Sequence, residues 1–173
     1  MEDGIQPFKI LFLCTGNSAR SIFGEYLIRK AAPHLFQSFS AGARPVGEVN
    51  PFALRVLKEA YNIDAADAWS KACDEVAHVE FDFVITVCDN ARETCPVWPG
   101  QPIIAHWGAP DPVEAEGTDE EKYQAFKQAA LLIKRRIDLL CALPFDKLDR
   151  LKLAALTCEI GLRGEEEAGR MGA

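Results

Sequence analysis

Residues 8–31 constrain the fold most strongly, because an apolar run, a polar turn and an amphipathic stretch follow one another there without a break. Residues 8–14, FKILFLC, form a continuous apolar run that is typical of a strand buried in a parallel sheet. The turn TGNSARS follows, and the apolar spacing of IFGEYLIRKA at 22–31 is close to that of a helix. A strand that leads directly into a helix predicts the first β–α unit of an α/β fold.

The same alternation continues along the chain. We predict strands at 36–42, 81–88 and 102–107, and helices at 50–63 and 119–143, the last with an acidic start and basic residues late. Strands that alternate with helices form a parallel sheet with right-handed crossovers, and such sheets bind ligands beyond the carboxyl ends of their strands. Cys14, Cys88 and Trp107 all fall at this edge.

The chain length and the proline at residue 144 predict one domain with a C-terminal extension. A chain of 173 residues that is 49% hydrophobic suits a single globular core. Pro144 interrupts the long helix, so we assign residues 1–143 to the domain and residues 144–173 to a C-terminal helical extension. Within that extension, 145–160 allows a further helix, and the segment from 161 onward, rich in glycine and charge, predicts a frayed, flexible tail.

Charge excludes several classes of partner. With 26 acidic and 19 basic residues the formal net charge is −7, which argues against a broad surface for nucleic acid or anionic membrane. The first residues, MEDGIQPFK, are acidic where a signal peptide is basic, and ILFLC is too short to span a bilayer. We therefore expect a cytoplasmic protein with no membrane contact, whose six cysteines are reduced.

The segment C14-T-G-N-S-A-R20-S21 carries the strongest functional signal. Backbone N–H groups in such a turn before a helix converge on one point and bind an oxyanion. Arg20 can reach the same point with a planar fork of donors, and its charge favours the thiolate of Cys14. Ser21 supplies a hydroxyl for the sulfur, and Asn17 tolerates the left-handed backbone of a tight loop. We predict a nucleophilic Cys14 in an oxyanion site formed by Thr15, Gly16, Asn17, Ser18, Ala19 and Arg20.

Cys88 and Cys95 form the second candidate feature. Taken singly, Cys88 is most simply a strand-end core residue and Cys95 a chance surface thiol. Beside an activated Cys14 the pair indicates a redox relay, because thiolate attack on sulfur can pass a disulfide along three thiols. Neither residue is needed to hydrolyse a phosphate ester.

The loop sequence resembles that of a known family. ILFLCTGNSARS is similar to the phosphate-binding loop of low-molecular-weight tyrosine phosphatases and of the thioredoxin-coupled arsenate reductases of the same fold, and the similarity extends from about Phe8 to Leu143. The arsenate reductases also show Cys-x6-Cys after the third strand, then H-W-G and D-P. This chain has Cys88, Cys95 and H106-W-G-A-P-D111-P in that order. The resemblance implies a three-layer α/β fold with a four-stranded parallel sheet in the order 2-1-3-4, flanked by helices.

The resemblance also implies residue roles. Asp111 corresponds to the general acid of the family, and Ser40 is expected to brace the loop through Asn17. Some relatives ligate a structural potassium ion with residues that match Asn17, Glu25 and Ser40, together with an aspartate. Lys71 stands at the place of that aspartate here, so an ammonium replaces the ion and we predict no metal.

Other candidate residues receive simpler interpretations. His34 and His78 lack ligand partners at suitable spacing, which favours surface or capping roles over metal binding. We assign His106 only packing or orientation, and we interpret Cys73, Cys141 and Cys158 as small apolar side chains. The basic run at 134–136 is interpreted as a solvated helix face.

Three functions remain open at this point. The first is an arsenate reductase that uses a Cys14–Cys88–Cys95 relay, needs no cofactor and is reset by thioredoxin or a similar dithiol. The second is a phosphotyrosine phosphatase, which uses Cys14, Arg20 and Asp111 alone; the aromatic residue that follows D-P in many such phosphatases is Val113 here. The third is a non-catalytic oxyanion-binding regulatory module.

Overall fold

Four parallel strands form the centre of the molecule. The structure is a computed structural model that describes residues 6–171, with side chains described through Arg163. The strands are β1 (Phe8–Cys14), β2 (Phe36–Gly42), β3 (Phe83–Thr86) and β4 (Ile103–His106), and their order in the sheet is β2-β1-β3-β4. The predicted order 2-1-3-4 is confirmed. Strands β3 and β4 are shorter than the predicted 81–88 and 102–107.

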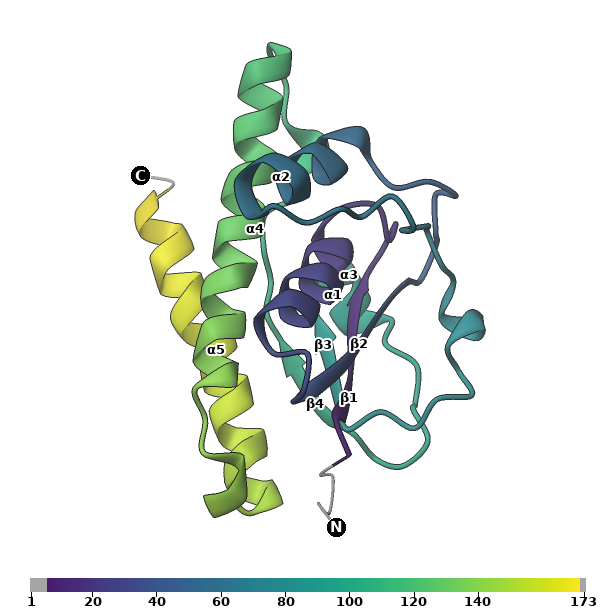
Figure 1. Ribbon diagram of the computed structural model, residues 1–173, viewed down its shortest axis with the longest axis vertical. Helices are drawn as coiled ribbons and strands as arrows, with labels where there is room; N and C mark the ends of the chain where they lie inside the picture. Colours follow the sequence, from purple (N-terminus) through teal and green to yellow (C-terminus); the bar gives the residue numbers. More distant parts are fainter. Residues whose placement is uncertain (1–5, 172–173) are drawn as a thin grey trace.

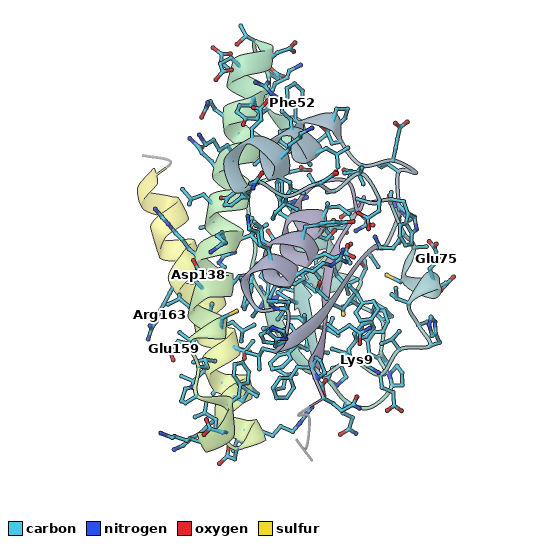
Figure 2. The ribbon with its side chains drawn as sticks, in the orientation of Figure 1. Lys9, Phe52, Glu75, Asp138, Glu159 and Arg163 are labelled. Atoms are coloured by element: carbon cyan, nitrogen blue, oxygen red, sulfur yellow. The ribbon has the colours of Figure 1, made fainter. Side chains whose placement is uncertain are left out.

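One face of the sheet is covered by long helices. They are α1 (Arg20–Ala31), α2 (Pro51–Tyr61), α4 (Asp119–Cys141) and α5 (Arg150–Met171). Helix α1 packs on β1 and β2, α4 packs on α1 and α2, and α5 runs alongside α4 and β4 (Figure 1). Phe52 of α2 lies against α4, where its ring centroid is 5.5 Å from that of Phe126 (Figure 2).

The opposite face has a thinner cover. Phe39 of β2 points to this face and stacks edge-on against Phe81, at 5.3 Å between ring centroids, and Phe81 in turn contacts Trp98 at 5.5 Å. Phe81 and Trp98 belong to connecting segments rather than to long helices. The five-residue helix α3 (Asp89–Glu93) follows β3 at the carboxyl edge. The chain therefore leaves β3 into short, irregular structure, close to the strand ends.

Two glycines inside helices permit close packing. A Cβ on Gly24 of α1 would lie 2.4 Å from the ring of Phe12, and a Cβ on Gly161 of α5 would lie 2.1 Å from the carbonyl oxygen of His106. The predicted end of the last helix at residue 160 is wrong, since α5 continues to Met171. Gly161 therefore lies inside the helix, where the lack of a side chain lets α5 approach the end of β4.

Candidate active site

Cys14 is the last residue of β1 and lines a cavity of about 740 Å³ at the carboxyl edge of the sheet. Its Sγ lies 2.8 Å from Ser21 Oγ and accepts a hydrogen bond from the Asn17 backbone N–H at 3.2 Å. The Asn17 side-chain amide donates to Ser21 Oγ at 2.8 Å, so the hydroxyl proton of Ser21 is free to point at the sulfur. The predicted support of Cys14 by Ser21 matches this geometry.

The loop is fixed from outside by backbone contacts. Asn17 is fully buried with φ 46°, in the left-handed region expected for it. Its Oδ1 accepts from the Lys71 backbone N–H at 2.7 Å, and Ser70 Oγ donates to the Gly16 carbonyl at 2.9 Å. Of the predicted oxyanion-loop residues, those that line the cavity are Thr15, Gly16, Ser18, Ala19 and Arg20.

Arg20 and Asp111 form an ion pair in the lining of the cavity. Arg20 Nη2 lies 3.3 Å from Asp111 Oδ2, and Nη1 donates to the Ala109 carbonyl at 3.0 Å. Asp111 Oδ1 accepts from the Val113 backbone N–H at 3.1 Å, which fixes the carboxylate at the start of a short 3₁₀ turn. The structure thus brings the predicted clamp and the predicted acid to one wall of the cavity.

Burial and the loop contacts act on the pKa of Cys14 in opposite directions. Burial raises the pKa of the Cys14 thiol, and the hydrogen bonds from Ser21 and Asn17 and the charge of Arg20 oppose this rise without cancelling it. Burial, which the loop sequence does not reveal, is thus the largest influence on the pKa of Cys14.

Cys88 faces the same cavity as Cys14. It is the N-cap of α3, where its Sγ accepts from the Ala91 backbone N–H at 3.3 Å. Thr15 Oγ1 lies 3.3 Å from the sulfur and accepts from Asn90 Nδ2 at 3.2 Å, which leaves the Thr15 hydroxyl proton available to Cys88. Two donors are therefore directed at this sulfur.

Cys95 lies outside this cavity. It follows α3, is partly buried and has a thiol whose pKa is raised by burial. It lines a separate cavity of about 290 Å³ beside β4. The structure therefore gathers four of the five predicted catalytic residues and leaves Cys95 in a separate cavity.

Ser40 contacts a different residue from the one expected. Its hydroxyl donates to Glu25 Oε2 at 2.5 Å, whereas both ends of the Asn17 side chain bond elsewhere, to Ser21 and to the Lys71 backbone. Ser40 points toward α1, which carries Glu25, so the predicted brace through Asn17 is wrong. Lys71 Nζ lies 3.5 Å from Glu25 Oε2, so an ammonium does occupy the neighbourhood of this carboxylate.

Two further contacts were not predicted from the sequence. Arg136 is 1% exposed and donates from Nη1 to the Gly108 carbonyl at 2.8 Å, so the interpretation of the basic run as a solvated face is wrong for this residue. His106 Nε2 lies 2.9 Å from Asp89 Oδ1, which ties β4 to the residue after Cys88. Both partners are distant in sequence, and one is a backbone carbonyl, so residue patterns gave no signal for either contact.

Among the side chains that the structure describes, through Arg163, no cluster of three or more His, Cys, Asp or Glu is placed to hold a metal ion. No helix within residues 6–171 is long and apolar enough to cross a bilayer.

Comparisons with known proteins agree with this geometry. Residues 9–151 match the model of the low molecular weight phosphotyrosine protein phosphatase family. An arsenate reductase of Halalkalibacterium halodurans is 40% identical over 128 residues, which cover 74% of this chain and 91% of that protein. An arsenate reductase of Bacillus subtilis is 36% identical over the same shares of both chains.

Solved structures with a similar fold also include arsenate reductases and a tyrosine phosphatase. An arsenate reductase in the phosphate binding state superposes with a TM-score of 0.63 at 25% identity, covering 78% of this chain and 97% of that one. The thioredoxin-dependent arsenate reductase of Corynebacterium glutamicum superposes with a TM-score of 0.54 at 27% identity, covering 77% of this chain and 63% of that one. A low molecular weight protein tyrosine phosphatase from T. tengcongensis, at 24% identity and a TM-score of 0.65 over 82% and 99% of the two chains, shares the fold.

Proposed function

Since the chain belongs to the low molecular weight phosphotyrosine protein phosphatase family, we propose that it acts within that family as an arsenate reductase. The observation that carries the proposal is the second thiol of the cavity. Cys88 lines the same cavity as Cys14 and is held by Thr15, the first residue of the oxyanion loop after Cys14. Hydrolysis of a phosphate ester does not use this thiol. Reduction of arsenate, in contrast, requires a second sulfur that can form a disulfide with the first. The names of the relatives point to the same reaction.

The first step joins arsenate to Cys14. The oxyanion binds to the backbone N–H groups of residues 15–20, and Arg20 transfers hydrogen bonds from Ala109 and Asp111 to it. Cys14 attacks arsenic as its thiolate, and one arsenate oxygen departs as water after receiving a proton from Asp111. Once Arg20 has turned to the oxyanion, the Asp111 carboxyl group is released from it and can stand beside the departing oxygen.

The second step reduces arsenic. The Cys88 thiolate attacks Cys14 Sγ, a disulfide forms, and the electron pair of the sulfur–arsenic bond moves onto arsenic. Arsenic thus passes from the +5 to the +3 state and leaves as arsenite, while two thiols become one disulfide. The contacts of Cys88 with the Ala91 N–H and the Thr15 hydroxyl hold its sulfur at the cavity that also contains Cys14.

The third step frees Cys14. Cys95 attacks Cys88 Sγ, which moves the disulfide to Cys88–Cys95 and returns Cys14 as a thiolate. A dithiol protein such as thioredoxin then reduces the new disulfide, as the name of the corynebacterial relative suggests. We place this cycle in the cytoplasm, where such reductants keep thiols reduced.

Replacing Cys88 by Ser tests the proposal. Wild-type protein with thioredoxin, thioredoxin reductase and NADPH is expected to release arsenite over many turnovers. Cys88→Ser is expected to release only traces of arsenite, yet to keep its hydrolysis of an aryl phosphate, which uses Cys14, Arg20 and Asp111. Cys141→Ser, a thiol on α4 away from the cavity, is the matched control and is expected to behave like wild type.

Phosphotyrosine hydrolysis is the second candidate, because a nucleophile, a clamp and an acid line one cavity. Arsenite release by Cys88→Ser at the wild-type rate would remove the relay. If wild-type protein also turned over aryl phosphate far faster than arsenate, the phosphatase function would take first place.

A further inference from the structure

A second thiol shares the cavity of Cys95. This cavity of about 290 Å³ is lined by Cys95 from the segment after α3 and by Cys158 from α5, together with Arg92 and His106. It lies at β4, where the Cys158 Sγ is 3.5 Å from the Ile104 carbonyl oxygen. Two cysteines from distant parts of the chain therefore face one space, beside two basic side chains.

Helix α5 holds Cys158 in this position. The Trp107 indole N–H donates to the Thr157 carbonyl at 3.0 Å, one residue before Cys158, and Thr157 is fully buried. Cys158 itself is exposed, on the part of α5 that also carries Glu159 and Arg163 on its outer side (Figure 2). The match to the family model ends at residue 151, so Cys158 lies beyond the part of the chain that this match covers.

We propose that Cys158 is a fourth redox thiol, which takes the disulfide from Cys88–Cys95 and stores it as Cys95–Cys158. The proposal rests on the proposed arsenate reductase function. The Cys158 thiolate attacks Cys95 Sγ, the Cys95–Cys158 bond forms, the Cys88–Cys95 bond breaks, and Cys88 leaves as a thiolate. No electrons enter or leave the protein in this exchange. An outside dithiol then reduces the stored disulfide, and its own two thiols become a disulfide.

The contacts of Cys88 suit it to be the leaving group. A disulfide breaks faster when the departing sulfur is a stable thiolate. Cys88 Sγ has the Ala91 backbone N–H at 3.3 Å and the Thr15 hydroxyl at 3.3 Å to stabilise that charge. Cys158 is exposed to solvent, so its sulfur is accessible for the attack.

The segment that carries Cys95 must move during the cycle. Residues 95–98 have no regular structure, and Val97 is fully exposed. Cys95 and Cys158 are free thiols that line one cavity, and a disulfide needs their Cα atoms about 5.5 Å apart, so the segment of Cys95 must close onto Cys158. The same segment must bring Cys95 to Cys88, and it can alternate between its two partners.

Cys73 is the other thiol near Cys95 and is a poorer acceptor. It is only partly exposed, whereas Cys158 is exposed, and it does not line the cavity that holds Cys95 and Cys158. Cys158 is also the more accessible of the two to an outside reductant.

Counting arsenite without any reductant tests the inference. Fully reduced protein, freed of small thiols under anaerobic conditions, receives excess arsenate. If Cys158 takes the disulfide, Cys14 and Cys88 are free again and react once more, so wild type is expected to release two arsenite per chain. It should end with the disulfides Cys95–Cys158 and Cys14–Cys88, identified by mass spectrometry after alkylation and digestion.

The variants separate the possible outcomes. Cys158→Ser and Cys158→Ala are expected to release one arsenite and to end as Cys88–Cys95, whereas the matched control Cys141→Ser should release two. One arsenite from wild type with a Cys88–Cys95 disulfide would overturn the storage role and leave the reductase function intact. A Cys73–Cys95 disulfide would also overturn it. Arsenite from none of the proteins would instead remove the proposed function itself.

Discussion

The oxyanion loop and the thiol segment after β3 sit at the same edge of the sheet but are built in different ways. In the loop, Asn17 is fully buried and bonds through its side chain to Ser21 and to the Lys71 backbone. In the thiol segment, a five-residue helix is followed by a stretch without regular structure, where Val97 is fully exposed. The loop is held by side-chain hydrogen bonds, whereas the segment that carries Cys95 is anchored at Trp98 and has no regular structure between α3 and that residue.

This difference corresponds to two tasks. Binding a tetrahedral anion needs donors that are already in place, because reorganising them would cost binding energy. Passing a disulfide from Cys14 to Cys88 and onward needs sulfurs that approach one another in turn, and Cys95 does not line the cavity of the other two. We infer that the fixed region does the oxyanion chemistry and that the looser region carries the oxidised state away.

Replacing the nucleophile should have the largest effect, because both regions depend on it. Cys14→Ser is expected to lower both arsenate reduction and aryl phosphate hydrolysis by at least about 1,000-fold, since a serine hydroxyl is a much weaker nucleophile than a thiolate. Initial rates of both reactions measure this. Substantial residual activity of either kind would remove Cys14 from the mechanism.

Removing Cys95 should separate the two regions. Cys95→Ser is expected to release up to one arsenite per chain and then stop, because the Cys14–Cys88 disulfide is not resolved. Aryl phosphate hydrolysis by the reduced protein should stay within about twofold of wild type, since Cys95 lies outside the oxyanion cavity. Mass spectrometry of the stalled protein should identify Cys14–Cys88. Sustained turnover with thioredoxin would contradict a relay through Cys95.

Weakening the frame of the loop should have a smaller effect, spread over both reactions. Asn17→Ala removes the acceptor of the buried Lys71 N–H, which costs about 1–3 kcal/mol, whereas Ser21 Oγ keeps its contact with Cys14 Sγ. Asn62→Ala is the matched control, because Asn62 also has a positive φ, 54°, but is exposed at the end of α2. Urea unfolding should show that Asn17→Ala is less stable than Asn62→Ala by about 1–3 kcal/mol. Equal losses would mean that the side-chain bonds of Asn17 contribute little.

The parts of the site that were predicted correctly are local in sequence. Cys14, Asn17 and Ser21 fall within one strand–turn–helix unit, so the pattern of residue types was enough to place them around a common point. The order of the strands followed from the family resemblance and is confirmed. Strand ends were less predictable, because Val87 and Cys88 continue the β-type pattern of β3 after its pairing with β1 and β4 has stopped.

The errors concern contacts made over long separations. Ser40 was assigned to Asn17, but in the fold its hydroxyl reaches Glu25 on α1. Arg136 lies in a basic run that suggested a solvated face, yet the helix turns it toward the Gly108 carbonyl in the loop before Asp111. For the pKa of Cys14, the local donors were visible in the sequence, whereas the burial that opposes them was not.

The smallest expected effect concerns the cation that supports the fixed region. Lys71 is buried, its Nζ donates to the Trp69 carbonyl at 2.9 Å, and it lies 3.5 Å from Glu25 Oε2 and 4.5 Å from the centre of the Trp69 ring. A tethered ammonium beside this carboxylate leaves no need for a free monovalent cation there. Exchanging potassium for sodium at constant ionic strength is therefore expected to change the melting temperature by less than about 1 °C, equivalent to less than about 0.5 kcal/mol for a chain of this size. Thermal unfolding in the two salts measures this difference, with Lys30→Met as a control variant, because Lys30 is an exposed lysine that donates to the Tyr61 carbonyl away from Glu25. A stabilisation specific to potassium in wild type, and equally in Lys30→Met, would show that an ion binds near Glu25 in spite of Lys71.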